Sequence, residues 1–165
     1  MKKIFFASKL LVLIVFLASF NNANLNLLPL KIGQKMPRQF TRIRAVNNTH
    51  YVLKDMYKEN GLCVLFSSNT CPFVISWEGR FNQIHDLCVK NKIGFVVLNS
   101  NEDKRKGNDS FFEMQKRAKD KQYKFIYAED KNSKMADALG AQFTPEVFLF
   151  DKFQVLEYKG AIDDN

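Results

Sequence analysis

The sequence feature that most constrains the fold is the stretch from Gly61 to Glu78, GLCVLFSSNTCPFVISWE. Its residues 62–66 form a continuous apolar run, which is typical of a strand buried on both faces. Four polar residues, 67–70, then favour a turn, and Pro72 suits the first position of a helix. The stretch therefore predicts a buried strand, a sharp turn and a helix, with Cys71 at the helix N-terminus.

The residues after Pro72 have the pattern of one long helix. Apolar side chains recur at three- and four-residue spacing, which gives a single apolar face: Val74, Trp77, Phe81, Ile84 and Cys88. We expect a helix from Pro72 to about Asn91, with Trp77 packed in the core. We expect Glu78 to be a surface carboxylate on the same helix.

Cys71 is the candidate reactive residue. A thiolate is the nucleophilic form of cysteine, and the positive end of a helix favours the thiolate over the thiol. The hydroxyls of Ser68 and Thr70 are close enough in sequence to hydrogen-bond the sulfur or an incoming peroxide oxygen. The pattern predicts redox or nucleophilic chemistry at Cys71. The alternative is that Cys71 is inert, in a degenerate site.

The other two cysteines are interpreted as small buried hydrophobic residues, because Cys63 lies in the apolar strand and Cys88 on the apolar helix face. The residue three positions after Cys71 is Val74, so the sequence has no Cys-x-x-Cys motif there. The sequence contains only two histidines and shows no cluster with metal-ligand spacing. We therefore predict neither a metal nor an organic cofactor.

The N-terminus predicts export. Two lysines follow Met1, and residues 10–20 form an apolar stretch of the length found in signal peptides. Residues 1–23 are interpreted as a signal peptide, or alternatively as an uncleaved N-terminal anchor, which would be the protein's only contact with a membrane. Residues 24–35 then form a lead-in segment and 36–165 one folded domain, located in the periplasm or secreted.

The charge of the chain does not indicate a nucleic-acid partner. The formal net charge is +8, and it falls to +5 without the three lysines of the signal segment, Lys2, Lys3 and Lys9. Between residues 102 and 130, basic and acidic residues interleave, which is typical of solvated helix and loop surface. No nucleic-acid motif accompanies the charge.

The remaining patterns predict an α/β domain. Further strands are expected at 40–46, 51–53, 95–98, 125–127, 147–150 and 155–159, and helices at 54–60, 110–121 and 132–139. Ser110 and Glu113 form a capping box, and Gly140 ends the last helix. Strands that alternate with helices and end in a C-terminal β-hairpin indicate a mixed central sheet flanked by helices. Pro145 begins a buried strand, where it donates no ladder bond.

A strand followed by a Cys-Pro corner, with Thr144-Pro145 before a terminal hairpin, resembles the thioredoxin fold. The blocks 68–74, 98–101, 144–151 and 160–165 are similar to the peroxiredoxin-like redoxins, also described as alkyl hydroperoxide reductase/thiol-specific antioxidant-like. The resemblance runs from about Lys31 to the last residue. It implies a thioredoxin-like fold and site residues Cys71, Ser68, Thr70, Thr144 and Pro145.

Three functions follow from these patterns. The first is an antioxidant peroxidase in which Cys71 reduces a peroxide and is recycled by an external thiol. The second is monothiol exchange with a disulfide substrate, in which the partner must supply the resolving thiol. The third is a non-catalytic binding module of the thioredoxin fold.

Overall fold

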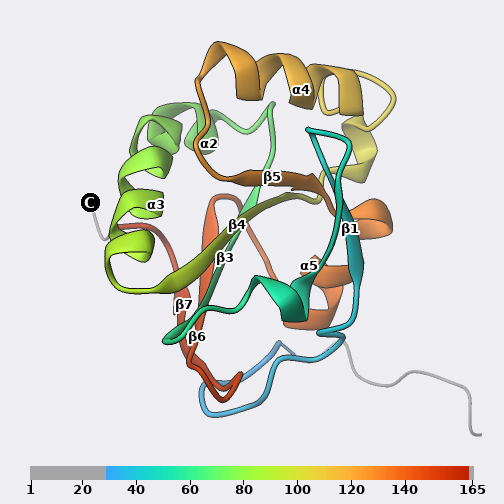
Figure 1. The fold of residues 1–165 in the computed structure, drawn as a ribbon. Coiled ribbons are helices and arrows are strands. Elements are labelled where there is room, and N and C mark those ends of the chain that lie inside the picture. The colour runs from blue at the N-terminus through green and yellow to red at the C-terminus, as the bar shows by residue number, and fades with distance from the viewer. Residues whose placement is uncertain (1–28, 164–165) are drawn as a thin grey trace, which may run out of the picture.

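The computed structural model describes residues 29–163, and it forms one seven-stranded sheet with the order β2-β1-β5-β4-β3-β6-β7 (Figure 1). The predicted signal peptide, residues 1–23, lies outside the described residues. The strands are β1 (Arg42–Ala45), β2 (His50–Val52), β3 (Gly61–Ser67), β4 (Ile93–Asn99), β5 (Ile126–Glu129), β6 (Glu146–Phe150) and β7 (Leu156–Gly160). Within residues 29–163, no helix is long and apolar enough to cross a membrane.

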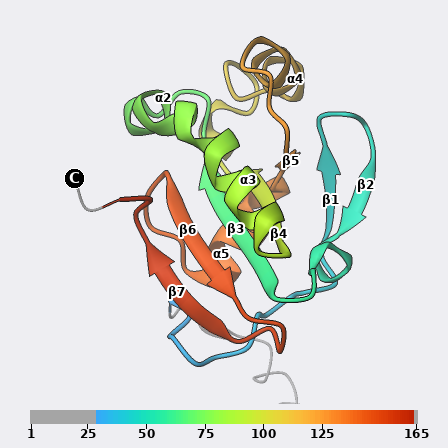
Figure 2. The same ribbon diagram turned by 60° about the vertical axis from the view of Figure 1, so that its left-hand side comes forward.

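The helices are α2 (Pro72–Trp77), α3 (Phe81–Lys90), α4 (Phe111–Asp120) and α5 (Lys134–Leu139). Short 3-10 turns complete the described elements: η1 (Leu53–Met56), η2 (Glu78–Arg80), η3 (Glu102–Lys104) and η4 (Lys131–Ser133). In Figure 2, α3 lies across one face of the sheet and α5 lies behind it on the other. The mixed sheet flanked by helices, with a C-terminal hairpin of β6 and β7, agrees with the sequence prediction.

The centre of the sheet is the buried strand that the sequence predicts. All seven residues of β3 are buried, and β3 pairs in parallel with β4 and antiparallel with β6. Its side chains alternate between two cores. Leu62, Val64 and Phe66 face the core under α5, whereas Cys63 and Leu65 face the core under α3 and α4. A strand that is buried on both faces in this way needs the continuous apolar run found at 62–66.

The helix after Cys71 differs from the prediction. The expected continuous helix from Pro72 to Asn91 is divided into α2, the 3-10 turn η2 and α3. The expected apolar face is present, since Val74, Phe81 and Cys88 are buried. Trp77 is only partly buried, and the guanidinium of Arg80 stacks on its ring at 4.4 Å from the centroid.

The prediction of a surface position for Glu78 is wrong. The Glu78 side chain is 4% exposed, and it forms ion pairs of 2.8 Å with both Arg117 and Lys121. The hydroxyl of Tyr123 donates to the same carboxylate at 3.0 Å. Three donors from α4 and the segment after it satisfy the carboxylate, which is why this charge is tolerated inside the protein. This cluster joins η2 to α4.

The lead-in segment completes the hairpin edge. The N–H of Gly33 donates to the carbonyl of Leu156, and the N–H of Leu156 donates to the carbonyl of Gln34, at 2.8 Å each. Farther along, α5 ends at Gly140 with a φ of 69°, a conformation that favours glycine. A Cβ atom at Gly140 would also collide with the backbone of Pro29. The predicted helix stop is therefore confirmed, and the lead-in segment packs against it.

Candidate functional site

Cys71 lies at the N-cap of α2, with an extended backbone (φ −73°, ψ 122°), and Pro72 begins the helix. Its side chain is half-buried, and its Sγ donates to the carbonyl oxygen of Thr144 at 3.2 Å. The Thr144–Pro145 peptide bond is cis. The structure thus brings Cys71 against the turn that precedes β6, although these residues are far apart in the sequence. The catalytic roles that the sequence predicts for them stay predictions.

A polar pocket opens beside Cys71, with a volume of about 430 Å³. Of the residues predicted to form one site with Cys71, Ser68, Thr70 and Thr144 line this pocket, whereas Pro145 does not. The rest of the wall comes from β3, from the loops after β4 and before β6, and from η4 and α5: Phe66, Ser100, Asn101, Ser133, Ala136, Asp137, Ala141, Gln142 and Phe143.

The Ser68 and Thr70 hydroxyls are directed to a carboxylate that the sequence analysis did not single out. Thr70 Oγ1 donates to Oδ2 of Asp109 at 2.8 Å, and Ser68 Oγ lies 3.2 and 3.3 Å from its two oxygens. Asp109 has no exposed surface. The expectation that 102–130 is a solvated surface is therefore wrong for Asp109.

Asp109 accepts further hydrogen bonds from the same turn and from the end of β4. Its carboxylate accepts from the backbone N–H of Asn69, from Asn99 Nδ2 at 2.6 Å and from Asn101 Nδ2 at 2.9 Å. These donors come from the turn before Cys71 and from the end of β4, so the carboxylate joins the two central strands at their C-terminal ends. The available sequence signal was Asn99 and Asn101 directly after a buried strand, opposite the polar turn of its parallel neighbour.

A second layer of side chains holds Asn69. The hydroxyl of Tyr127 donates to Asn69 Oδ1 at 2.8 Å and accepts from Asn99 Nδ2 at 2.9 Å. Tyr127 is buried, and this burial raises the pKa of its hydroxyl, so that it remains a donor. Together these contacts satisfy the buried polar groups around residues 67–71, the turn between β3 and α2, as a low-dielectric interior requires.

An apolar groove of about 340 Å³ lies on the other side of Thr144. Phe73 and Phe143 form part of its wall, and they are 69% and 50% exposed. The other residues of the groove are Trp77, Thr144, Pro145, Ala161, Ile162 and Asp163. Because Phe143 and Thr144 line both hollows, the polar pocket and the apolar groove meet next to Cys71.

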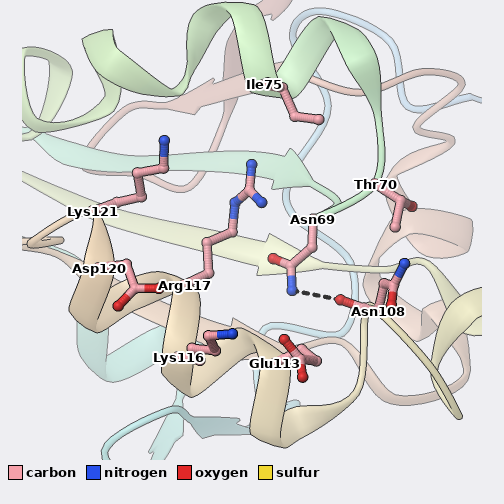
Figure 3. A pocket seen from close by; sticks show the side chains of 9 residues that line it. All are labelled: Asn69, Thr70, Ile75, Asn108, Glu113, Lys116, Arg117, Asp120 and Lys121. Atoms are coloured by element: carbon pink, nitrogen blue, oxygen red, sulfur yellow. Dashed lines mark hydrogen bonds between the residues drawn. The ribbon is translucent and has the colours of Figure 1, made fainter.

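A third hollow, of about 540 Å³, lies between the turn that precedes Cys71 and α4 (Figure 3). Asn69 and Thr70 form one side of it, and Figure 3 shows Arg117 extending into it from α4. The charged residues on α4 and just after it carry both signs: Glu113, Lys116, Arg117, Asp120 and Lys121. Arg117 and Lys121 are paired with Glu78. Cys71 lines the polar pocket and is not among the residues that line this third hollow.

The other two cysteines are placed as the sequence analysis expects. Cys63 and Cys88 are both buried in the core under α3. A hydrogen bond with Cys88 and burial raise the pKa of the Cys63 thiol. Cys71 is therefore the accessible thiol of the three, and Val74, which occupies the place of a second active-site cysteine, is fully buried.

Comparison with known proteins identifies relatives of the whole described domain. A family model described as Redoxin matches residues 31–165. A search of the curated proteins finds no significant match.

Several solved structures are similar to this chain. An uncharacterized conserved protein from Geobacillus kaustophilus is 26% identical with a TM-score of 0.76, covering 82% of this chain and 71% of that one. A hypothetical protein from Sinorhizobium meliloti 1021 is also 26% identical, with a TM-score of 0.73 and coverage of 84% and 74%. A putative thiol:disulfide interchange protein DsbE from Chlorobium tepidum is 17% identical, with a TM-score of 0.64 and coverage of 80% and 86%. These similarities confirm the predicted thioredoxin-like fold.

Proposed function

The chain belongs to the redoxin family, and we propose that it is a single-cysteine thiol-disulfide oxidoreductase in which Cys71 is the nucleophile. Family membership supports a thiol oxidoreductase in general. The observation that carries the proposal is the position of Cys71, half-buried where the polar pocket meets the apolar groove. Cys63 and Cys88 are buried away from both hollows.

The proposed reaction is thiol–disulfide exchange. The Cys71 thiolate attacks one sulfur of a disulfide, forms a mixed disulfide and releases the other sulfur as a thiolate. A second thiol, from the partner or from a small-molecule reductant, then attacks the mixed disulfide and returns Cys71 to the thiol. Because Val74 occupies the place of a second cysteine, the resolving thiol comes from outside the chain.

The apolar groove favours a disulfide within a peptide or protein as the substrate. Exposed aromatic rings are unfavourable in water, and a substrate segment beside its disulfide would cover Phe73 and Phe143. The groove begins at Thr144, whose carbonyl contacts the Cys71 sulfur. A substrate bound there would place its disulfide next to the attacking atom.

Peroxide reduction is the second candidate, and the polar pocket favours it. The pocket is large enough for a small peroxide, and its wall carries hydroxyl and amide groups next to Cys71. In this reaction the thiolate attacks the O–O bond, Cys71 becomes a sulfenic acid, and hydroxide leaves. An external thiol condenses with the sulfenic acid to give a mixed disulfide and water, and a second thiol releases Cys71.

One experiment separates the two candidates. The reduced protein is exposed either to bis(2-hydroxyethyl) disulfide or to stoichiometric hydrogen peroxide with dimedone, and each adduct is mapped by mass spectrometry. Exchange predicts a rapid mixed disulfide at Cys71, whereas the peroxidase predicts a rapid dimedone adduct there. Cys71→Ser should remove both adducts, and the matched variant Cys88→Ser should keep them. Absence of both adducts from the wild-type protein would reject an active Cys71.

We also propose that the protein is exported. The support is the N-terminal sequence, in which Lys2 and Lys3 precede the apolar stretch 10–20. Expression of the full chain followed by cell fractionation and N-terminal sequencing tests this. A mature protein outside the cytoplasm that begins near residue 24 supports cleavage. A full-length membrane-bound chain indicates the uncleaved anchor, and a full-length cytoplasmic chain contradicts export.

A further inference from the structure

We propose that Asp109 is a positioning residue that makes the polar pocket beside Cys71 select neutral and cationic reactants over anionic ones. The inference rests on the proposed function, because it concerns the reactants that reach Cys71. It follows from two features of Asp109: the direction of the hydrogen bonds that it accepts, and the sign of its buried charge.

The first feature is the direction of the hydrogen bonds. An ionised carboxylate only accepts hydrogen bonds, and a hydroxyl has a single proton to donate. Thr70 gives this proton to Asp109 at 2.8 Å, and Asn101 Nδ2 donates to the Thr70 oxygen at 3.1 Å. Ser68 has a similar arrangement, since its oxygen accepts from the backbone N–H of Thr70 at 3.2 Å and its proton faces Asp109. Both hydroxyls therefore lack a proton to offer to a reactant in the pocket.

The second feature is charge. The residues that line the pocket include no lysine, arginine or histidine, and they include one exposed carboxylate, Asp137. The nearby cation Arg105 donates to the backbone carbonyl of Asp109, and it is already paired with Glu102 at 3.2 Å and Glu129 at 3.6 Å. Among residues 29–163, no cationic side chain forms an ion pair with the Asp109 carboxylate, which lies behind the wall.

The charge preference of the polar pocket is therefore opposite to the one that the net charge of the whole chain would predict. The formal net charge of +8 should attract anions to the surface. At the polar pocket, a negative charge stands behind the part of the wall where the Ser68 and Thr70 hydroxyls offer only acceptor oxygens. An anionic disulfide would meet repulsion there and find no donor in the Ser68 and Thr70 hydroxyls, whereas an ammonium group would meet their acceptor oxygens.

The test compares three small disulfides of different charge: cystamine (cationic), bis(2-hydroxyethyl) disulfide (neutral) and dithiodiglycolate (anionic). The rate of mixed-disulfide formation at Cys71 is measured for each at low ionic strength, with the native protein and with the same protein unfolded in urea. The ratio of the cystamine rate to the dithiodiglycolate rate should be larger in the native protein, by about fivefold or more, the scale expected for a nearby charge.

Three variants assign the effect. Asp109→Asn should lower the native ratio towards that of the unfolded chain, because it removes the charge at nearly constant volume. Thr70→Val keeps the charge and should keep most of the ratio, even where the absolute rates change. Asp137→Asn is the matched control, since it removes an exposed and solvent-screened carboxylate of the same pocket, and it should change the ratio less than Asp109→Asn.

The outcomes are distinct. The inference is overturned if the ratio of the cystamine rate to the dithiodiglycolate rate is the same in native and unfolded protein. It is also overturned if Asp109→Asn leaves the raised native ratio unchanged and Asp137→Asn abolishes it. If Asp109→Asn does not fold, Asp137→Asn replaces it as the test: a raised rate ratio that persists in Asp137→Asn then supports the inference. A raised ratio that is lost in Asp137→Asn overturns it. Reaction of Cys71 with none of the three disulfides would overturn exchange itself, and the inference with it.

Discussion

The Cys71 sulfur lies 3.2 Å from the carbonyl oxygen of Thr144, although 73 residues separate them along the chain. The contact depends on the pairing of β3 with β6, which brings the end of one strand beside the start of the other. It places the Cys71 thiol where the polar pocket meets the apolar groove. This arrangement is the basis of the proposed exchange reaction.

A resolving thiol introduced at position 74 should change the type of reaction. Val74 is three residues after Cys71 and is the first buried residue of α2. Val74→Cys is expected to form an internal disulfide with Cys71 after oxidation and to catalyse reduction of insulin by dithiothreitol, which the wild-type protein should do poorly. Turbidity of insulin measures this, with Val74→Ser as the control. A wild-type rate equal to that of Val74→Cys would contradict the requirement for an external resolving thiol.

Removal of Glu78 should destabilise the protein strongly. Glu78→Ala leaves Arg117, whose side chain is 18% exposed, without its carboxylate partner. Loss of one member of a buried pair costs about 3–5 kcal/mol in unfolding free energy. The matched variant Glu59→Ala breaks an exposed pair with Lys92 and should cost less than about 1 kcal/mol. Urea unfolding measures both, and equal losses would disprove the structural importance of the buried cluster.

The stability contributed by Asp130 should fall as pH rises. Burial raises the pKa of this carboxyl, although backbone N–H groups of Met135 and Ala136 oppose the shift. Its contribution is therefore fully present below the unfolded-state pKa of about 3.9 and is lost as pH rises through the folded-state value. The unfolding free energy of wild type minus that of Asp130→Asn should decrease as pH rises from about 3.9 through the raised folded-state pKa. A difference that stays constant or increases over this range would show that the sign is wrong.

Gly140 should not tolerate a side chain. Gly140→Ala places a Cβ against Pro29 and forces alanine into a positive φ, which should lower the unfolding free energy by about 1–3 kcal/mol or more. Gly79 has open space around it, so Gly79→Ala should be neutral or stabilising by up to about 1 kcal/mol. Thermal melts of the two variants measure this contrast. Similar melting temperatures would indicate that α5 ends without need of glycine.

The sequence predicts the central layer of this fold well because the signal there is local. An apolar run such as 62–66 can be buried only between two covered faces, and Pro72 and Gly140 mark helix ends by backbone chemistry alone. Cys71 is identifiable for the same reason. The start of the last strand at Pro145 also follows from the missing N–H of proline.

The sequence does not predict the buried charges, because their partners are distant in the chain. Asp109 lies in a charged, polar segment, and its burial depends on Ser68, Asn69 and Thr70 about 40 residues earlier. Glu78 is similar, since its partners Arg117 and Tyr123 lie on α4 and after it. Periodicity describes the face of one element, but it contains no information about which polar groups meet across elements.

The proposed role of Cys71 is tested most directly by the rate at which it forms a mixed disulfide with bis(2-hydroxyethyl) disulfide, compared with cysteine in solution at the same pH. We expect native Cys71 to react faster than free cysteine. We also expect Cys63 to stay unmodified, because the hydrogen bond with Cys88 and burial raise its pKa and keep it protonated. If Cys71 reacts no faster than cysteine, or if Cys63 reacts equally fast, the assignment of Cys71 as the nucleophile would be contradicted.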